Sequence, residues 1–360
     1  MSSLSACATV THGLPRLQVM FLLSITVLNL FLLLYIALPI VLGRFPKVYH
    51  SFIFKPRDRW GHKEEHFSCF ESLRLSSLSA RNFYLETADT HDRIGVWHIL
   101  PYENQVDSNT APPSCATFEK ALMNGSPIFI YFHGNTKTRA VPWRIDIYKL
   151  LSSLGYNVIA FDYRGYGDSS GKMTGERDCV HDSLAVLKYV YERCGSSPVF
   201  FWGHSLGTGV VGSLVQFLLH EADRSSPNFH LPRGLILDAP FTNIAQVMMS
   251  RRPFWIHRLL PPINKRMTLL TSSLRVEFNT VDNLSGCPVP ILILHAKDDR
   301  LVPFRLGEQL AASLKKLSSV TFVPFETVRH LGHNFIHTAP EMPNIIRRFV
   351  QESITGVSNN

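Results

Sequence analysis

The sequence predicts an α/β protein whose mostly parallel central sheet carries helices on both faces. Strand-like segments rich in β-branched and aromatic residues alternate with helix-like segments along most of the chain, which is typical of parallel sheets. One of these strands runs through a Gly-rich turn around Ser205 directly into an apolar helix. Acidic residues and histidines that suit catalysis follow two later strands. Together these features favour an enzyme with its site at the carboxyl edge of the sheet.

The alternation sets the expected order of elements. Two antiparallel strands are expected first, at 82–87 and 93–99, followed by a polar loop insertion at 103–126. The strands of the parallel region are expected at 127–132, 157–163, 198–202, 234–238, 288–295 and 320–325. The helices are expected at 141–154, 176–191, 206–222, 304–317 and 340–352. Segment 242–286, which is basic, apolar and interrupted by proline, breaks this rhythm and predicts a small cap over the site.

The N-terminal region predicts a membrane anchor. Residues 17–43 hold no Asp, Glu, Lys, Arg or His, and an apolar run of this length can cross the hydrocarbon core of a bilayer. A cleaved signal peptide would have a shorter apolar core and a small-residue cleavage site. We therefore expect a short tail at 1–16, a transmembrane anchor at 17–43, a juxtamembrane stalk at 44–75, the catalytic domain at 76–352 and a polar tail at 353–360.

Composition narrows the expected partners to lipids. The chain has 360 residues, 45% of them hydrophobic, and a formal net charge of +8, which favours anionic surfaces. The stalk mixes basic and aromatic residues, which settle at lipid headgroups, whereas the globular part holds no basic aromatic motif for nucleic acid. The six cysteines include no Cys-x-x-Cys pair, so neither a zinc site nor a redox motif is indicated. We expect a lipid substrate and a bilayer as partners, with no cofactor and no metal.

The orientation of the catalytic domain stays open on charge alone. More Lys and Arg residues follow the anchor than precede it, which favours a cytosolic domain. Two Asn-x-Ser sequons, at Asn124 and Asn283, are compatible with a luminal domain.

Ser205 is the candidate nucleophile. It stands at the centre of Gly203-His204-Ser205-Leu206-Gly207, between an expected strand and an expected helix. Such a turn lifts a serine hydroxyl above the sheet in a strained conformation that needs small neighbours, which glycines supply. This arrangement is the nucleophile elbow of α/β hydrolases.

The general base is expected after the last strand. His333 stands in a Gly-His-Asn turn before the final helix and is preferred to His330 and His337. The spacing of these three histidines also suits metal ligands, but no carboxylate or cysteine accompanies them.

The acid that orients the base is expected after the preceding strand. Asp299 is preferred, because the spacing of His295, Asp299, Val302 and Pro303 puts it at the strand-to-helix turn, and Pro303 opens the helix that follows. Asp298 is the alternative acid; if it is not the acid, its expected role is structural, as a helix cap. Asp238 is the third candidate.

Two backbone donors are expected for the oxyanion. The N–H group of Leu206 is the first. The second is expected from the turn His133-Gly134-Asn135-Thr136, where Asn135 or Thr136 would donate from the main chain.

Six spaced motifs, together with IGVWH and the single N-terminal anchor, resemble the family of α/β-hydrolase domain-containing protein 12. They are FHGN, FDYRGYGDS, WGHSLGTG, DAPFTNI, LILHAKDDRLVPF and GHNFIHTAPEMP, within residues 94–349. The resemblance implies a membrane-anchored serine hydrolase of the α/β-hydrolase fold that cleaves lysophosphatidylserine or monoacylglycerol, with its domain in the lumen of the endoplasmic reticulum. It assigns Ser205 as nucleophile, Asp299 as acid and His333 as base. The sequence departs from the family at Thr136-Lys137, where Ala-Gly is common.

The expected function is therefore deacylation of lysophospholipids or monoacylglycerols through an acyl-Ser205 intermediate. The basic residues of the cap would favour an anionic head group: Arg251, Arg252, Arg258, Lys265, Arg266 and Arg275. The alternatives are a thioesterase of the same fold and a catalytically silent hydrolase fold that binds a lipid or a partner.

Overall fold

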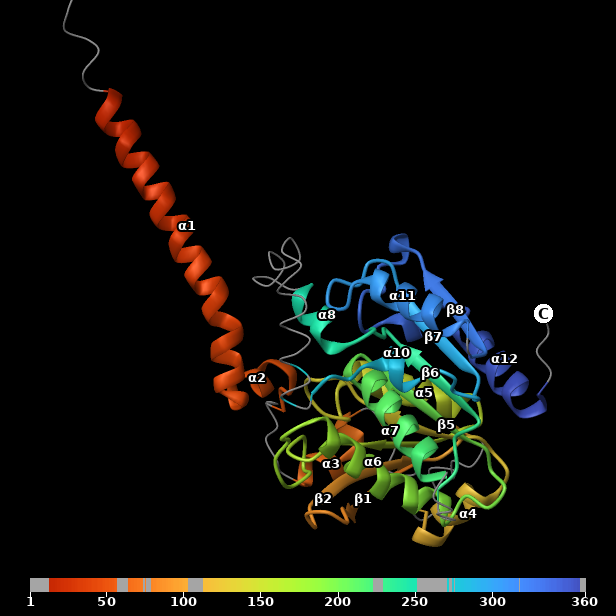
Figure 1. The fold of residues 1–360 in the computed structure, drawn as a ribbon. Coiled ribbons are helices and arrows are strands. Elements are labelled where there is room, and N and C mark those ends of the chain that lie inside the picture. The colour runs from red at the N-terminus through yellow and green to blue at the C-terminus, as the bar shows by residue number, and fades with distance from the viewer. Residues whose placement is uncertain are drawn as a thin grey trace, which may run out of the picture.

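The computed structural model describes residues 13–56, 64–73, 75, 79–102, 113–222, 229–250, 271, 274, 276–316 and 318–356. Its centre is an eight-stranded sheet in the order β1-β2-β4-β3-β5-β6-β7-β8 (Figure 1). The strands are β1 Ala80–Glu86, β2 Arg93–Ile99, β3 Ile128–Phe132, β4 Asn157–Phe161, β5 Val199–His204, β6 Gly234–Asp238, β7 Ile291–Ala296 and β8 Val320–Phe325.

The direction of the strands confirms the expected mostly parallel sheet. Strand β2 pairs antiparallel with β1 and with β4, and every other pair from β4 to β8 is parallel. The carboxyl ends of the parallel strands therefore meet at one edge, where α/β proteins place their sites.

Helices cover both faces of the sheet. The long helices are α1 Gly13–Arg44, α5 Pro142–Ser153, α6 Glu176–Tyr191, α7 Leu206–Ala222, α11 Phe304–Leu314 and α12 Met342–Thr355. The short ones are α2 Pro46–Ile53, α3 Glu65–Ser68, η1 Phe70–Leu73, α4 Cys115–Met123, α8 Ile244–Met249, α10 Thr280–Asn283, η4 Thr327–Arg329 and η5 Ile336–Thr338.

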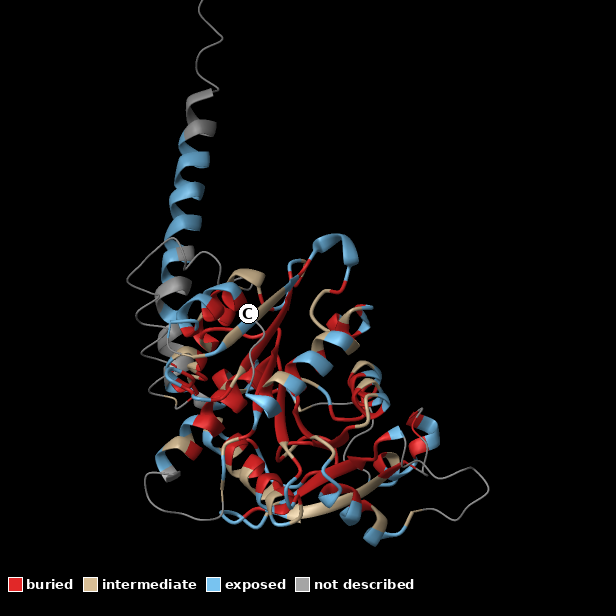
Figure 2. Ribbon diagram, turned by 90° about the vertical axis from the view of Figure 1, so that its right-hand side faces the viewer, coloured by how far each residue is buried: buried red, intermediate tan, exposed pale blue. Residues whose placement is uncertain are grey.

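The core consists of two apolar layers, one on each face of the sheet. Helices α6, α7 and α11 pack with one set of alternate strand residues, and α5 and α12 pack with the other set. The central strands are buried on both faces, which is why their sequences read as continuous apolar runs (Figure 2).

Two segments differ from the sequence-based expectation. The expected loop insertion contains α4, whose first turn is capped by the Ser114 side chain accepting a hydrogen bond from the Thr117 N–H group. In the expected stalk, Tyr49 and Ile53 of α2 and the following Phe54 are only 0%, 2% and 5% exposed. They belong to the apolar layer that also contains residues of α6 and α7. Part of this segment is thus packed into the domain rather than laid on its surface.

Within the part of the chain that the structure describes, no helix has both the length and the apolar character needed to cross a membrane. The central stretch of the expected cap, with its basic residues at 251, 252, 258, 265, 266 and 275, lies outside the described residues.

Candidate active site

Ser205 occupies the sharp turn between β5 and α7. Its φ is +54°, a left-handed conformation that costs a non-glycine residue free energy and is held here by the packed strand and helix. A Cβ atom at Gly203 would lie 2.6 Å from the Gly207 carbonyl oxygen, and one at Gly207 would overlap the Phe132 carbonyl oxygen. The two glycines are therefore required by close contact, as the elbow motif predicts.

The main chain of the elbow is fixed while its hydroxyl is not. The Ser205 N–H group donates to the Asp238 carbonyl oxygen at 2.9 Å. Among the described residues the hydroxyl has no hydrogen-bond partner, and the residue is 8% exposed. Burial raises the pKa of Asp238 to about 8.

Asp299 and His333 come together although they lie on different loops. His333 Nδ1 donates to Asp299 Oδ2 at 2.6 Å. The other carboxylate oxygen accepts from the N–H groups of Leu301 and Val302 at 2.7 and 2.9 Å, which fixes the plane of the carboxylate. Burial would raise the pKa of Asp299, but hydrogen bonds from His295 and His333 outweigh it and hold the pKa below its usual value. The acid is thus ionised and aimed at the imidazole.

The alternative residues take other positions. Asp298 accepts a hydrogen bond from the Gly332 N–H group at 3.1 Å and so supports the loop that carries His333. His330 is exposed beyond η4, and His337 is buried in η5. In the described part of the chain, no group of three or more His, Cys, Asp or Glu side chains is placed to hold a metal ion.

His204 joins the elbow to the loop that carries His333, and sequence reasoning missed it. Its Nε2 donates to the His333 carbonyl oxygen at 3.0 Å, and the two rings lie 5.0 Å apart. Burial lowers the pKa of His204 to about 3, so the ring stays neutral. His204 occupies the variable position before the serine in the Gly-x-Ser-x-Gly motif, so the motif does not predict its contact with the His333 loop.

The expected oxyanion turn lies against the elbow. A Cβ atom at Gly134 would stand 3.3 Å from the Ser205 Cβ atom, so glycine lets the turn approach Ser205 closely. His133 Nδ1 donates to the Gly134 carbonyl oxygen at 2.7 Å, and burial lowers the pKa of His133 well below its usual value. The turn follows directly on the Phe132 and His133 carbonyls, which lie against Gly207 in the first turn of α7. The Leu206 N–H group, at the first position of α7, has no partner within its own helix.

The loop after β4 forms a buried ionic network beneath this site. Arg139 contacts Asp162 and Asp168 at 2.6 and 2.7 Å, with all three side chains inaccessible to solvent. Arg164 contacts Asp182 at 2.7 Å. These contacts agree with a structural role for the FDYRGYGDS motif, because buried charges need such pairing.

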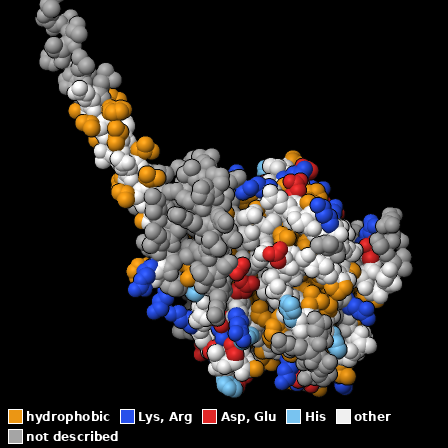
Figure 3. All heavy atoms as spheres, in the orientation of Figure 1, with side chains coloured by type: hydrophobic (Ala, Val, Ile, Leu, Met, Phe, Trp, Pro, Cys, Tyr) orange, Lys and Arg blue, Asp and Glu red, His pale blue; other side chains and the backbone are white. Residues whose placement is uncertain are grey.

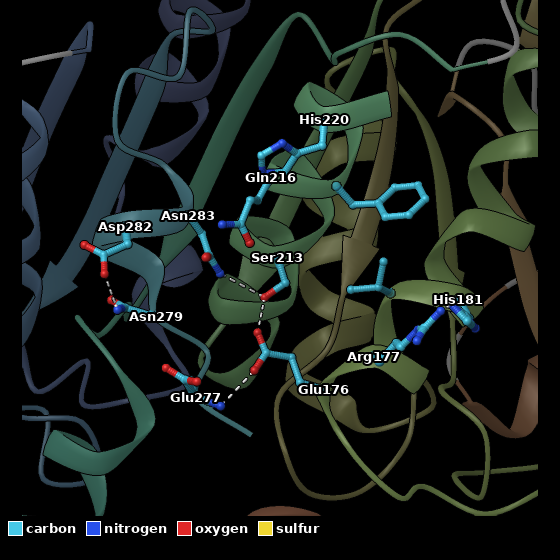
Figure 4. Close-up of a pocket in the computed structure, with 12 residues that line it drawn as sticks. Glu176, Arg177, His181, Ser213, Gln216, His220, Glu277, Asn279, Asp282 and Asn283 are labelled. Atoms are coloured by element: carbon cyan, nitrogen blue, oxygen red, sulfur yellow. Dashed lines mark hydrogen bonds between the residues drawn. The ribbon is translucent and has the colours of Figure 1, made fainter. Parts of the chain in front are cut away.

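A separate pocket of about 620 Å³ lies between α6, α7 and α10, two turns along α7 from the elbow (Figure 4). At its base the Glu176 carboxylate accepts hydrogen bonds from Ser213 and from the N–H groups of Glu277 and Phe278. None of the expected catalytic or oxyanion residues lines this pocket.

Comparisons with known proteins agree with this architecture. A family model described as the α/β hydrolase fold matches residues 127–219. The zebrafish (Danio rerio) lysophosphatidylserine lipase ABHD12 is 35% identical over 88% of this chain and 81% of its own length. The rat (Rattus norvegicus) protein of the same name is 39% identical over 76% of this chain and 67% of its own. The human (Homo sapiens) protein ABHD12B is 31% identical over 75% and 72%.

Solved structures share the fold at low sequence identity. An esterase from Pyrococcus furiosus superposes with a TM-score of 0.54 at 19% identity, covering 84% of this chain and 97% of the esterase. An α/β hydrolase from Vibrio vulnificus gives a TM-score of 0.55 at 17% identity, covering 82% and 88%.

Proposed function

The chain belongs to the α/β-hydrolase family of the ABHD12 lysophosphatidylserine lipases and is a serine hydrolase, and from this premise we propose that it deacylates lysophosphatidylserine and related single-chain lipids. Ser205 is the proposed nucleophile, His333 the general base and Asp299 its orienting acid. The observation that carries the assignment is the 2.6 Å hydrogen bond from His333 to Asp299, on a loop that the His204 side chain joins to the strained Ser205 turn.

The proposed mechanism follows from this geometry. The Ser205 hydroxyl attacks the ester carbonyl while Nε2 of His333 takes its proton, and the ionised Asp299 stabilises the imidazolium that forms. The N–H groups of Leu206 and of Asn135 or Thr136 stabilise the negative oxygen of the tetrahedral intermediate. His333 then gives its proton to the departing glycerol oxygen of the head-group portion, and water hydrolyses the acyl-serine by the same route, which releases the fatty acid.

The anchor proposed at residues 17–43 would bring the domain to its substrate. The uncharged sequence supports it, as do the apolar side chains exposed along α1, such as Met20, Phe21 and Leu28 at 66%, 67% and 67% (Figure 3). Apolar side chains exposed on a single helix are stabilised by lipid rather than by water. A tethered hydrolase would meet single-chain lipids as they leave the bilayer.

An anionic head group is the proposed preference, and Lys137 is the nearest described cation to the oxyanion turn along the chain. It is exposed, has φ of +62°, and holds its ammonium group 4.5 Å from the centre of the Trp143 ring. No acidic partner for Lys137 appears among the described residues. A lysine placed in this way can pair with a phosphate or carboxylate.

Lys137→Gln is expected to lower kcat/KM for lysophosphatidylserine about five- to tenfold and to leave monoacylglycerol hydrolysis within twofold, because only the former loses an ion pair. The measurement is a hydrolysis assay of the purified full chain on lysophosphatidylserine, lysophosphatidylcholine, monoacylglycerol and acyl-CoA with one acyl chain. Lys149→Gln, at an exposed position of α5, is the matched control.

If Lys137→Gln lowers kcat/KM equally for lysophosphatidylserine and for monoacylglycerol, Lys137 has no role in head-group preference. Preferred turnover of acyl-CoA would replace the proposed lipid substrate by a thioester, and no turnover of any ester would overturn the proposed function.

A luminal domain is proposed, and the two sequons differ in a way that tests it. Asn124 is exposed after α4, whereas Asn283 is 8% exposed and its Nδ2 donates to Ser213 Oγ. In cells, we expect one glycan, at Asn124, seen as a gel shift that peptide N-glycosidase reverses. Ser126→Ala should abolish the shift, and Ser285→Ala should leave it unchanged. If neither the wild type nor Ser285→Ala shows a shift, the luminal orientation is contradicted.

A further inference from the structure

The segment that follows the long N-terminal helix makes direct contact with the oxyanion turn. Lys55 forms an isolated parallel bridge with Thr136, and its N–H group donates to the Asn135 carbonyl oxygen at 2.9 Å. The Tyr166 hydroxyl donates to the same oxygen at 3.1 Å and lies 3.1 Å from the Lys55 nitrogen, from which it accepts. One carbonyl of the turn is thus held by two donors from distant parts of the chain.

Holding a carbonyl also fixes the donor of the same peptide group. A peptide is planar and trans, so its N–H group points opposite to its C=O group. The Asn135 carbonyl, held by Lys55 and Tyr166, fixes the Thr136 N–H group. The Gly134 carbonyl, held by His133 Nδ1, fixes the Asn135 N–H group in the same way.

The Tyr166 hydroxyl is itself held firmly. Tyr166 is 0% exposed, and its ring lies 5.0 Å from the His133 ring and 6.2 Å from the Tyr163 ring in edge contacts. Burial raises the pKa of Tyr166, so the hydroxyl keeps its proton and remains a donor at any working pH. The packed ring therefore keeps the hydroxyl oxygen next to the Asn135 carbonyl.

The other donor belongs to a segment that is built into the core. Tyr49, Ile53 and Phe54 are buried, and the Phe54 ring meets the Phe278 ring at 6.2 Å in an edge contact. The chain then runs one residue further and reaches the oxyanion turn at Lys55. The α2 segment therefore extends from the end of α1 to the turn beside the nucleophile.

We propose that the Tyr166 hydroxyl and the main-chain N–H group of Lys55 are positioning groups for the oxyanion turn, and that α2 is in this way a working part of the active site. The inference rests on the proposed function. The two groups touch no substrate; they hold the Asn135–Thr136 peptide so that its donor is in place before the negative charge develops, when reorganisation would be costly.

Tyr166→Phe tests the side-chain contact. We expect kcat for a short-chain ester to fall about tenfold with KM within twofold, because a loosened donor loses less than the hundredfold or more of a deleted one. Binding of an alkyl boronic acid, which forms a tetrahedral adduct with serine, should weaken by a similar factor. Tyr191→Phe is the matched control, because it also removes one hydroxyl-to-carbonyl bond, to His230 on the far side of the domain.

A pair of variants at Lys55 tests the main-chain contact. Lys55→Pro removes the N–H group, and Phe54 already has the extended conformation that suits a residue before proline. Lys55→Ala keeps the N–H group and removes only an exposed side chain. We expect Lys55→Pro to lower kcat about tenfold and Lys55→Ala to stay within twofold of wild type, with thermal unfolding recorded for each.

The outcomes separate this inference from the proposed function. If wild type hydrolyses esters and Tyr166→Phe keeps its kcat, or loses activity only through KM, the positioning role is overturned. Equal losses in Lys55→Pro and Lys55→Ala overturn the main-chain contact. If Lys55→Pro does not fold, Tyr166→Phe alone decides. A wild type without esterase activity contradicts the proposed function instead.

Discussion

Replacing Ser205 by alanine is expected to lower kcat for ester hydrolysis by roughly a million-fold, to the background rate. The elbow holds this residue at φ +54° against α7, and alanine fits the same conformation without the hydroxyl. No acyl-enzyme can form, because the attacking oxygen is gone. The measurement is turnover of lysophosphatidylserine together with labelling by a fluorophosphonate probe, which reacts with activated serines.

Ser153→Ala, at an exposed position of α5, is the control and should label and turn over like wild type. Labelling that persists in Ser205→Ala would place the reactive serine elsewhere and overturn the assignment. If the wild type binds the lipid but is not labelled by the probe, the result favours a catalytically silent fold that binds lipid.

Replacing Asp299 by asparagine is expected to lower kcat about ten-thousandfold while KM changes little. The carboxylate accepts from His333 Nδ1 and from two N–H groups, so an amide of the same shape loses the charge that stabilises the imidazolium. It also favours the wrong imidazole tautomer. Steady-state kinetics check this, since kcat should fall while KM stays close to that of wild type.

Asp298→Asn is the matched control one residue away. Its carboxylate contacts the Gly332 N–H group rather than an imidazole, so we expect losses below tenfold. If Asp298→Asn were the more damaging variant, the acid would be reassigned to Asp298.

The central parallel strands could be predicted because they are buried on both faces. A strand such as Ile128–Phe132 reads as an unbroken apolar run and begins and ends at turn residues, so its bounds follow from composition. The α2 segment could not be predicted in the same way. Its aromatic and basic residues suit a lipid interface as well as a core, and only the packed structure puts Tyr49 and Phe54 inside.

The triad candidates followed from topology, because residues at the carboxyl ends of neighbouring parallel strands converge. This reasoning reached Asp299 and His333, which the structure brings within hydrogen-bond distance. It did not reach His204 or Tyr166, which act on main-chain carbonyls. Contacts of that kind depend on where the backbone runs, and neither residue type nor spacing signals them.

The position of α2 decides where a fragment that keeps the folded domain intact has to begin. A fragment cut before Pro46 would keep Tyr49, Ile53 and Phe54 in their places, whereas one cut after Pro56 would empty sites for which large-to-small changes cost about 2–5 kcal/mol each. The folded domain thus begins at the break between α1 and α2, well upstream of the first strand.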